Sequence, residues 1–184
     1  MKELSLNILD ITYNSVKAKA DKIEITVSER ESLNLVEITI RDNGCGMDEE
    51  FLNRVTDPFV TTRTTRKVGL GIPLFKQSAE DADGTFSIQS KVGEGTQVYA
   101  SFRLDHLDRA PIGDMSSTLT SLIQANDQIR FIYTHTTDLG TFVLDTDELH
   151  AQLGDEIPLS EPAILNWIGE YINENLEDIQ GGKI

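Results

Sequence analysis

The sequence is poor in features that would place it among secreted or membrane proteins. It has a single cysteine, Cys45, so no disulfide can form within the chain, and such sparse cysteine is typical of a reducing compartment. No apolar run approaches the roughly 20 residues that a membrane-spanning helix needs. The opening residues, Met1 to Leu4, lack the apolar segment of a signal peptide. We therefore expect a cytoplasmic protein with no membrane contact.

Basic residues are scarce in the second half of the chain. Residues 1–103 contain 16 acids and 13 bases, whereas residues 104–184 contain 15 acids and 3 bases. Binding to nucleic acid requires clustered lysine and arginine, so this distribution argues against a nucleic-acid partner. The acidic half either faces a basic partner or forms a well-solvated surface.

The length and composition are those of a globular protein. With 184 residues, 39% hydrophobic and 26% charged, the chain is long enough to bury a substantial core. These values predict one domain, or one domain with a sizeable extension.

A helix is predicted over residues 4–20, because apolar residues recur there at helical spacing. Asp10, Asn14 and Lys17 share one face of this helix, since they stand at positions i, i+4 and i+7. Such a row can be a surface salt-bridge array. It can also be a ligand site, in which the amide oxygen of Asn14 binds a divalent cation, Lys17 lies beside a phosphate and Asp10 lies beside a water.

Two predicted strands, 23–27 and 35–40, lead into a glycine-containing turn. Asp42 stands at the end of the second strand, directly before an Asn-Gly pair. Gly44 and Gly46 can adopt positive φ and let the backbone approach a ligand closely. Asp42 is then either a fixed acceptor for a donor on a base or sugar, or part of an ordinary hairpin turn.

Two further local signals follow the glycine turn. Asp48 is predicted to cap a short helix that ends near Val55. Further along, strands are predicted over 85–90 and 96–103, and a glycine-containing hairpin joins them.

Residues 57–68 are rich in threonine and include Arg63 among several basic residues. This stretch is either a mobile surface loop or a lid that closes over phosphates. Gly69 and Gly71 follow it, at the entrance of a helix predicted to reach Glu80. Free amide groups and the positive end of the helix dipole at such an entrance favour an anionic phosphate.

The order of these motifs resembles that of the GHKL superfamily of gyrase, chaperone, mismatch-repair and histidine-kinase ATPase domains. The resemblance covers roughly residues 4–103. It implies an α/β (α+β) two-layer sandwich, the Bergerat ATP-binding fold, in which helices cover one face of a mixed sheet and ATP lies between the helices and a lid. The matching motifs run from Asp10 to Ala18, Asp42 to Met47, Asp57 to Thr62, Gly69 to Ile72 and Gly93 to Thr96.

The resemblance also implies roles for individual residues, with ATP and Mg²⁺ as cofactors. Asn14 would hold the magnesium ion, and Lys17 would approach a phosphate. Asp42 would accept a hydrogen bond from the adenine amine, Gly46 would shape the base pocket, and Thr96 would support Asp42 through a water. The full set implied to bind the nucleotide is Asn14, Lys17, Asp42, Gly44, Gly46, Met47, Phe59, Thr61, Thr62, Arg63 and Thr96, together with Gly69, Leu70 and Gly71 where the lid closes.

Within the superfamily, two branches are each favoured by different residues. Lys17 and the run 57–63 look like histidine-kinase catalytic domains. Asp10 instead stands where hydrolytic members carry a glutamate that activates water. The side chain of aspartate is one methylene shorter than that of glutamate, which shortens its reach as a general base.

A sensor kinase also needs a phosphoacceptor histidine on a dimerising helix upstream. Because only 13 residues precede Asn14, we expect that helical hairpin to be absent. We expect His106, His135 and His150 to be surface or partly buried residues rather than acceptors. A kinase built on this chain would then act on a separate protein.

Three functions therefore remain open. The first is a Mg-ATP-binding, kinase-like protein that acts on a separate protein substrate. The second is an ATP-hydrolysing dimeric switch that uses Asp10 as the base. The third is a non-enzymatic module in which ATP only orders the lid and exposes a surface for a partner.

The resemblance ends after Arg103. We predict a linker over 104–114 and an acidic α+β extension over 115–184, which we expect to contact a partner or a second copy of the chain. Its predicted elements are a helix over 116–125, a hairpin formed by 129–133 and 141–144, a helix from Asp147 that ends at Gly154, and a final helix capped by Ser160.

The final helix carries an apolar stripe that runs from Ile164 to Ile179. The stripe either packs on the hairpin of the same extension or forms a dimer or partner face. The extension contains no catalytic constellation.

Overall fold

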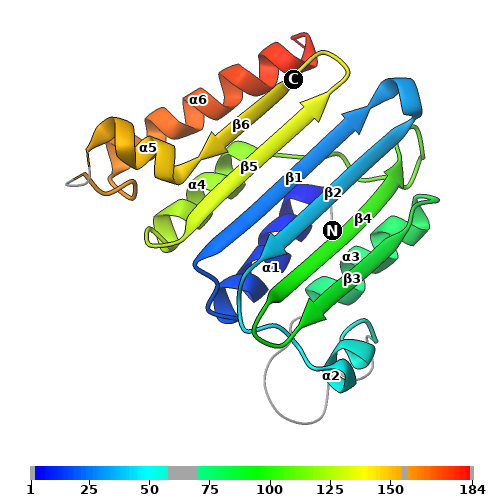
Figure 1. The fold of residues 1–184 in the computed structure, drawn as a ribbon. Coiled ribbons are helices and arrows are strands. Elements are labelled where there is room, and N and C mark those ends of the chain that lie inside the picture. The colour runs from blue at the N-terminus through cyan, green and yellow to red at the C-terminus, as the bar shows by residue number, and fades with distance from the viewer. Residues whose placement is uncertain (1–2, 58–69, 155–156, 183–184) are drawn as a thin grey trace.

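The computed structural model describes residues 3–57, 70–154 and 157–182. In these ranges one mixed sheet has the strand order β3-β4-β2-β1-β5-β6 (Figure 1). Neighbouring strands pair antiparallel except β1 and β5, which are parallel. The strands are β1 Lys22–Arg30, β2 Leu35–Asp42, β3 Phe86–Lys91, β4 Gly95–Arg103, β5 Arg130–Thr137 and β6 Thr141–Asp145.

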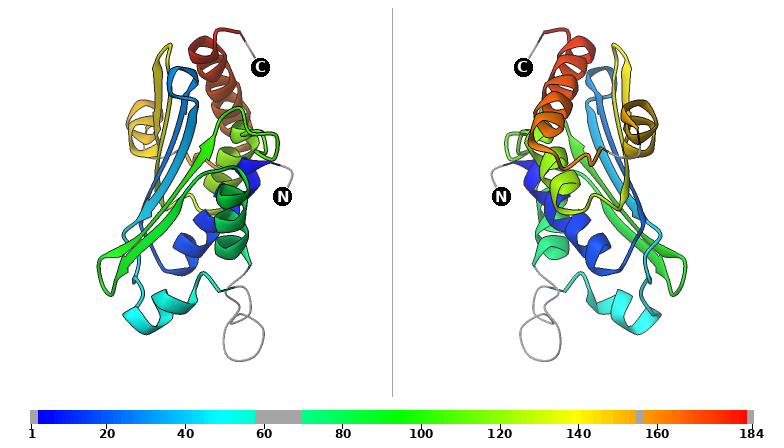
Figure 2. Two further views of the ribbon diagram at one scale, coloured as in Figure 1. Left: turned by 90° about the vertical axis from the view of Figure 1, so that its right-hand side faces the viewer. Right: turned by 90° about the vertical axis from the view of Figure 1, so that its left-hand side faces the viewer.

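Helices cover mainly one face of the sheet. Figure 2 shows α1, α3, α4 and α6 on that face and α5 on the opposite one. The predicted α+β fold with a mixed sheet is therefore confirmed. The helices are α1 Leu4–Lys17, α2 Glu49–Arg54, α3 Gly71–Asp81, α4 Met115–Ala125, α5 Thr146–Leu153 and α6 Pro162–Gln180, and a 3-10 helix, η1, spans Glu31–Leu33.

The core lies between the sheet and the four helices on its covered face. In β2 the alternate residues Val36, Ile38 and Ile40 are almost fully buried, while their neighbours are partly exposed. Alternation of this kind follows from the two-residue period of a strand. The facing side of α1 contributes Leu4 and Ile8, which are fully buried. Each such aliphatic side chain stabilises the fold by about 1.5–3 kcal/mol. None of the helices in the described ranges combines the length and the apolar character needed to cross a membrane.

Most predicted elements are present, although several of their boundaries differ. Asp48 caps α2 as predicted, since its carboxylate accepts a hydrogen bond of 2.7 Å from the amide of Phe51. The prediction that Ser160 caps the last helix is wrong: the N-cap is Glu161. Proline occupies the first turn of α6 and favours an extended residue directly before it, so the helix begins one residue later than expected. The first helix ends at Lys17, because Lys19 has a φ of 62°.

The extension continues the same sheet as the first half. β5 pairs with β1 over its length, from Lys22 opposite Arg130 to Glu29 opposite Thr137. β6 pairs with the far side of β5, and α6 packs over both strands and against α4. One sheet therefore runs through both parts of the chain. The predicted division of the chain into domains at residues 103 and 115 stays a prediction.

A buried hydrogen-bond network ties the extension to β1. The Nε2 atom of His135 lies 2.8 Å from Oε1 of Glu29, and its Nδ1 atom lies 2.6 Å from the hydroxyl oxygen of Tyr133. Gln180 of α6 donates to the same Glu29 oxygen at 3.2 Å. His135 is fully buried, so the expectation that it is a surface or partly buried residue is wrong. It can be buried because both ring nitrogens have partners.

Glu29 is ionised more readily in this network than in water. Burial acts to raise the pKa of Glu29, but the hydrogen bonds from His135 and Gln180 and the nearby positive charge outweigh it. The pKa of Glu29 therefore lies below its ordinary value of 4.5. A carboxyl group with a lowered pKa in the folded state contributes stability above its unfolded pKa, and this contribution is lost as the pH falls through the folded value.

We expect Glu29→Gln to reduce the loss of stability on acidification. The amide keeps an oxygen that can accept from His135, but it has no charge to titrate. Urea unfolding between pH 7 and pH 3 measures this, as the free energy of unfolding against pH. Tyr133→Phe is the control, because it removes a neutral hydroxyl from the same network and should lower stability at every pH. An acid profile of Glu29→Gln as steep as that of the wild type would contradict the prediction.

Candidate functional site

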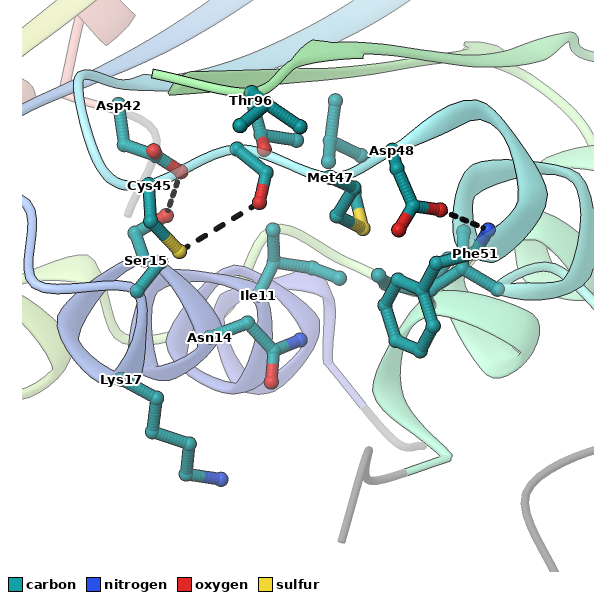
Figure 3. Close-up of a pocket in the computed structure, with 16 residues that line it drawn as sticks. Ile11, Asn14, Ser15, Lys17, Asp42, Cys45, Met47, Asp48, Phe51 and Thr96 are labelled. Carbon is teal, nitrogen blue, oxygen red and sulfur yellow. Dashed lines mark hydrogen bonds between the residues drawn. The ribbon is translucent and has the colours of Figure 1, made fainter. Parts of the chain in front are cut away.

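A cavity of about 620 Å³ lies between α1, the turn after β2, α2 and β4 (Figure 3). Its volume is within the roughly 300–1,000 Å³ of small-molecule sites. Apolar side chains form most of its wall, and a few polar groups stand among them. The apolar wall residues are Ile11, Ala18, Met47, Phe51, Val55, Ile72, Val92 and Val98.

Asp42 is the fixed polar group of this cavity. It ends β2 and is only 8% exposed. One carboxylate oxygen accepts from the hydroxyl of Ser15 at 2.5 Å (Figure 3), and the other accepts from the amide of Gly44 at 2.9 Å. Thr96, its partner across β2 and β4, also lines the cavity. Two hydrogen bonds fix the carboxylate while it keeps further acceptor capacity for a ligand donor.

The glycine turn is pressed between two other parts of the chain. A Cβ atom on Gly46, which has a φ of 69°, would lie 2.0 Å from the carbonyl oxygen of Lys91. A Cβ atom on Gly44 would lie 2.8 Å from that of Ala18. Gly46 thus meets the predicted need for positive φ, whereas Gly44 meets a need for space alone. The amide of Cys45 donates to the Ala18 carbonyl at 2.9 Å, which anchors the turn to the end of α1.

Two serines that the sequence did not single out hold the site together. Ser15 bonds Asp42, and Ser90 accepts from the amide of Met47 at 2.8 Å and lies 2.8 Å from the hydroxyl of Thr96. A signal for Ser15 was present: it continues the buried side of α1 that includes Ile11, and a buried hydroxyl needs a partner. No comparable signal marks Ser90.

Asn14 and Lys17 line the cavity from α1. In Figure 3 their side chains point the same way, away from Asp42. The cavity therefore has a fixed acid at one side and an amide and an amine at another. The described residues include no cluster of three or more histidine, cysteine or acidic side chains that could hold a metal. A magnesium ion here would take the Asn14 oxygen together with ligand oxygens and water, which suits its preference for hard oxygen ligands.

Asp10 lies one turn before Asn14 and is exposed, but it is not among the residues that line the cavity. A Cβ atom on Gly71 would lie 3.2 Å from that of Asp10, so Asp10 lies against the first residue of α3. The N-cap of that helix is Leu70, whose side chain makes no capping hydrogen bond. The first amides of a helix have no partner within the helix, so the start of α3 suits an anion.

The predicted site residues divide into three groups. Asn14, Lys17, Asp42, Gly46, Met47 and Thr96 come together around one cavity. Asp10, Gly44, Leu70 and Gly71 are not part of its lining. Phe59, Thr61, Thr62, Arg63 and Gly69 lie outside the described residues. The roles of all of them stay predictions.

The chain has relatives among sensor proteins. The family described as "Histidine kinase-, DNA gyrase B-, and HSP90-like ATPase" matches residues 1–106. A protein of Shewanella frigidimarina (strain NCIMB 400) that is named as a sensor protein is 38% identical over 85 residues, which cover 46% of this chain and 13% of that protein. The sensor histidine kinase YxdK of Bacillus subtilis (strain 168) is 32% identical over 108 residues, covering 55% of this chain and 33% of the kinase. The chain thus spans a third or less of the length of these relatives.

A solved structure shares the fold. The crystal structure of the N-terminal domain of a DNA repair protein has a TM-score of 0.54 and 17% sequence identity, and the match covers 79% of this chain and 53% of that one. At this identity the likeness concerns the fold alone.

We expect Gly46→Ala to destabilise the protein more than Gly93→Ala. Both glycines have positive φ, of 69° and 79°, so either alanine is strained by about 1–2 kcal/mol. Only at position 46 does the new Cβ collide with backbone, whereas at position 93 nothing lies within 4 Å. The collision should add roughly 1–3 kcal/mol. Urea unfolding of the two variants measures the difference in their free energies of unfolding. Equal losses of stability would contradict the prediction, because the turn would then accommodate the added methyl group at no cost.

Proposed function

Because the chain belongs to the family of histidine kinase-, DNA gyrase B- and HSP90-like ATPases, we propose that its cavity binds ATP with magnesium and serves transfer of the γ-phosphoryl group to a separate protein. The observation that carries this proposal is the arrangement of the cavity. The immobilised carboxylate of Asp42 stands at one side, and Asn14 and Lys17 project from α1 away from it.

The Asp42 side of the cavity suits an adenine ring. A carboxylate that already accepts from Ser15 and Gly44 cannot turn away, so it offers an acceptor in a fixed position to the exocyclic amine. The flanking Met47 and Val98 side chains exclude water from the flat faces of a base. Because Asp42 is largely buried, a donor that fails to reach it leaves its acceptor capacity unmet, which favours a base with an amine at that place.

The α1 side of the cavity suits the phosphates. Lys17 brings a positive charge, and Asn14 brings an oxygen that can join phosphate oxygens around magnesium. Magnesium, when bound, neutralises the charge that develops on the phosphoryl group. The start of α3 lies against Asp10, one turn of α1 before Asn14, so the first amides of α3 are a further candidate for contact with phosphate. Catalysis of phosphoryl transfer consists mainly of such positioning and charge neutralisation.

The relatives named as sensor histidine kinases support a kinase. The histidines of this sequence are poorly placed to accept the phosphoryl group. His135 is fully buried with partners at both nitrogens. His106 and His150 are partly exposed, but neither lines the described part of the cavity. None of these three histidines is therefore the acceptor in this proposal, which places the acceptor on a separate protein.

A hydrolytic switch is the second candidate. Asp10 is exposed one helical turn before Asn14 and lies against Gly71. A carboxylate at that place can accept a proton from a water that attacks the terminal phosphate. Hydrolysis would then change the state of the protein rather than modify a partner.

We expect Asp42→Asn to weaken ATP binding by roughly tenfold to a hundredfold, because an amide group presents a donor or a poorer acceptor to the adenine amine. Asp48→Asn is the matched control. It removes the same charge from the lining of the same cavity, and asparagine caps helices as well as aspartate. Calorimetric titration with ATP and ADP, with and without magnesium, measures both. No binding of either nucleotide by the wild type would overturn the proposal.

Labelled ATP separates the possible reactions. With a candidate partner protein, we expect label on the partner and none after Asn14→Ala, which removes the magnesium ligand. If the chain is instead a hydrolytic switch, free phosphate appears without a partner and Asp10→Asn abolishes it while ATP affinity is kept. If ATP binds tightly but neither labelled partner nor free phosphate forms, the chain is a nucleotide-sensing module, and the proposal that it is a kinase is contradicted.

A further inference from the structure

The last helix exposes an aromatic pair. Trp167 is 42% exposed, and its indole stacks on the ring of Tyr171 with centroids 5.4 Å apart and planes 11° apart. Tyr171 in turn meets Phe142 of β6 edge to face at 5.6 Å. The pair is therefore anchored to the sheet at one end and open to solvent at the other. Large exposed aromatic side chains that are held rigid are common anchors of protein interfaces.

Acidic residues continue this face of α6. Glu170, Glu174 and Asp178 follow Trp167 at spacings of three, seven and eleven residues, which place them along the same side of the helix. All three are exposed. None forms an ion pair with a residue that the structure describes. From residue 131 to residue 182 the sequence contains eleven acids and neither lysine nor arginine.

This charge pattern is unfavourable for the helix itself. Glu170 and Glu174, and likewise Glu174 and Asp178, repel each other as like charges at i and i+4. Asp178 also lies in the last turn, where the negative end of the helix dipole disfavours acids, and that turn has no basic residue. Departures from local stability rules of this kind are expected at functional surfaces.

We propose that this face of α6, formed by Trp167, Tyr171, Glu170, Glu174 and Asp178, is a docking surface for a lysine- or arginine-bearing segment of a partner protein. A guanidinium or ammonium group stacks on the exposed indole and pairs with the carboxylates beside it. A second copy of the same face would bring like charges together, so it is the poorer occupant. The surface lies over β5 and β6 at one edge of the sheet, whereas α2 lies beyond the opposite edge (Figure 1), and the proposal goes beyond the nucleotide chemistry.

The protein has a built-in probe for this surface, because Trp167 is its only tryptophan. Titration of the full chain with a short synthetic peptide of alternating arginine and alanine should change the tryptophan fluorescence saturably. The same peptide with glutamate in place of arginine should leave it unchanged. Binding should weaken as sodium chloride is raised, because salt screens exposed charges. An unchanged emission with the arginine peptide would overturn the proposal.

Paired variants distinguish the site from the net charge of the protein. Glu170→Gln with Glu174→Gln should weaken peptide binding by roughly threefold to tenfold, as the loss of two exposed ion pairs implies. The control is Asp108→Asn with Glu148→Gln. These two residues are exposed and lie outside α6, and the two substitutions remove the same amount of charge. Equal weakening by both pairs would show attraction by net charge alone and contradict the proposal.

Removal of the aromatic anchor completes the test. Trp167→Leu, with its fold checked by circular dichroism, should weaken binding of the arginine peptide by at least about threefold, as loss of a cation–π contact implies, when measured by calorimetry. Unchanged affinity in this variant would contradict the role of the aromatic pair. Self-association of the wild type that buries Trp167 in the absence of peptide would also contradict it.

Discussion

The contact between α1 and the end of β2 sets the geometry on which the site depends. The hydroxyl of Ser15 and the amide of Gly44 hold the Asp42 carboxylate, and the Ala18 carbonyl accepts from the turn that follows it. These bonds fix how close the helix comes to the sheet, and so fix the width of the cavity between them. Asn14 and Lys17 project from the same helix, so their positions relative to Asp42 follow from the same contact. A ligand that spans the cavity thus meets groups whose separation is set before it binds, which favours affinity because less ordering remains to be done.

Local signals in the sequence predicted much of the structure. Alternation identified β2, an aspartate before a helical run identified the Asp48 cap, and the order of motifs identified Asn14, Asp42 and Thr96, which the fold brings around one cavity. Those motifs work at short range, because each depends on the conformation of a few consecutive residues. Contacts between residues far apart in the sequence escaped this reasoning. Ser15 and Asp42 are 27 positions apart, and His135 and Glu29 are 106 apart. The helical period indicates that Ser15 is buried, but nothing local identifies Asp42 as its partner. For His135 the pairing of β5 with β1 decides the partner.

The two halves of the chain divide their polar groups differently. In the first half the polar groups that face the cavity are few, and Asp42 is held by hydrogen bonds. In the extension the acids of α6 are exposed and lack ion-pair partners among the described residues, while the buried His135 is hydrogen-bonded to Tyr133 and to Glu29 of β1. Specific recognition of a small molecule needs fixed groups, whereas recognition of a charged surface tolerates mobile ones. One sheet supports both the cavity and the exposed face of α6, because α2 and α6 lie at opposite edges of that sheet (Figure 1).

The parallel pairing of β5 with β1 has a consequence for how the chain can be divided. β1 has β2 on one side and β5 on the other, so it is a central strand of the sheet. If the chain were cut after residue 106, the backbone donors and acceptors that β1 directs toward β5 would lose their partners. The cut would leave an edge of nine residues, rich in β-branched side chains, with little to prevent it from pairing with another chain. The extension therefore covers an edge of the first half that would otherwise be open to pairing with another strand.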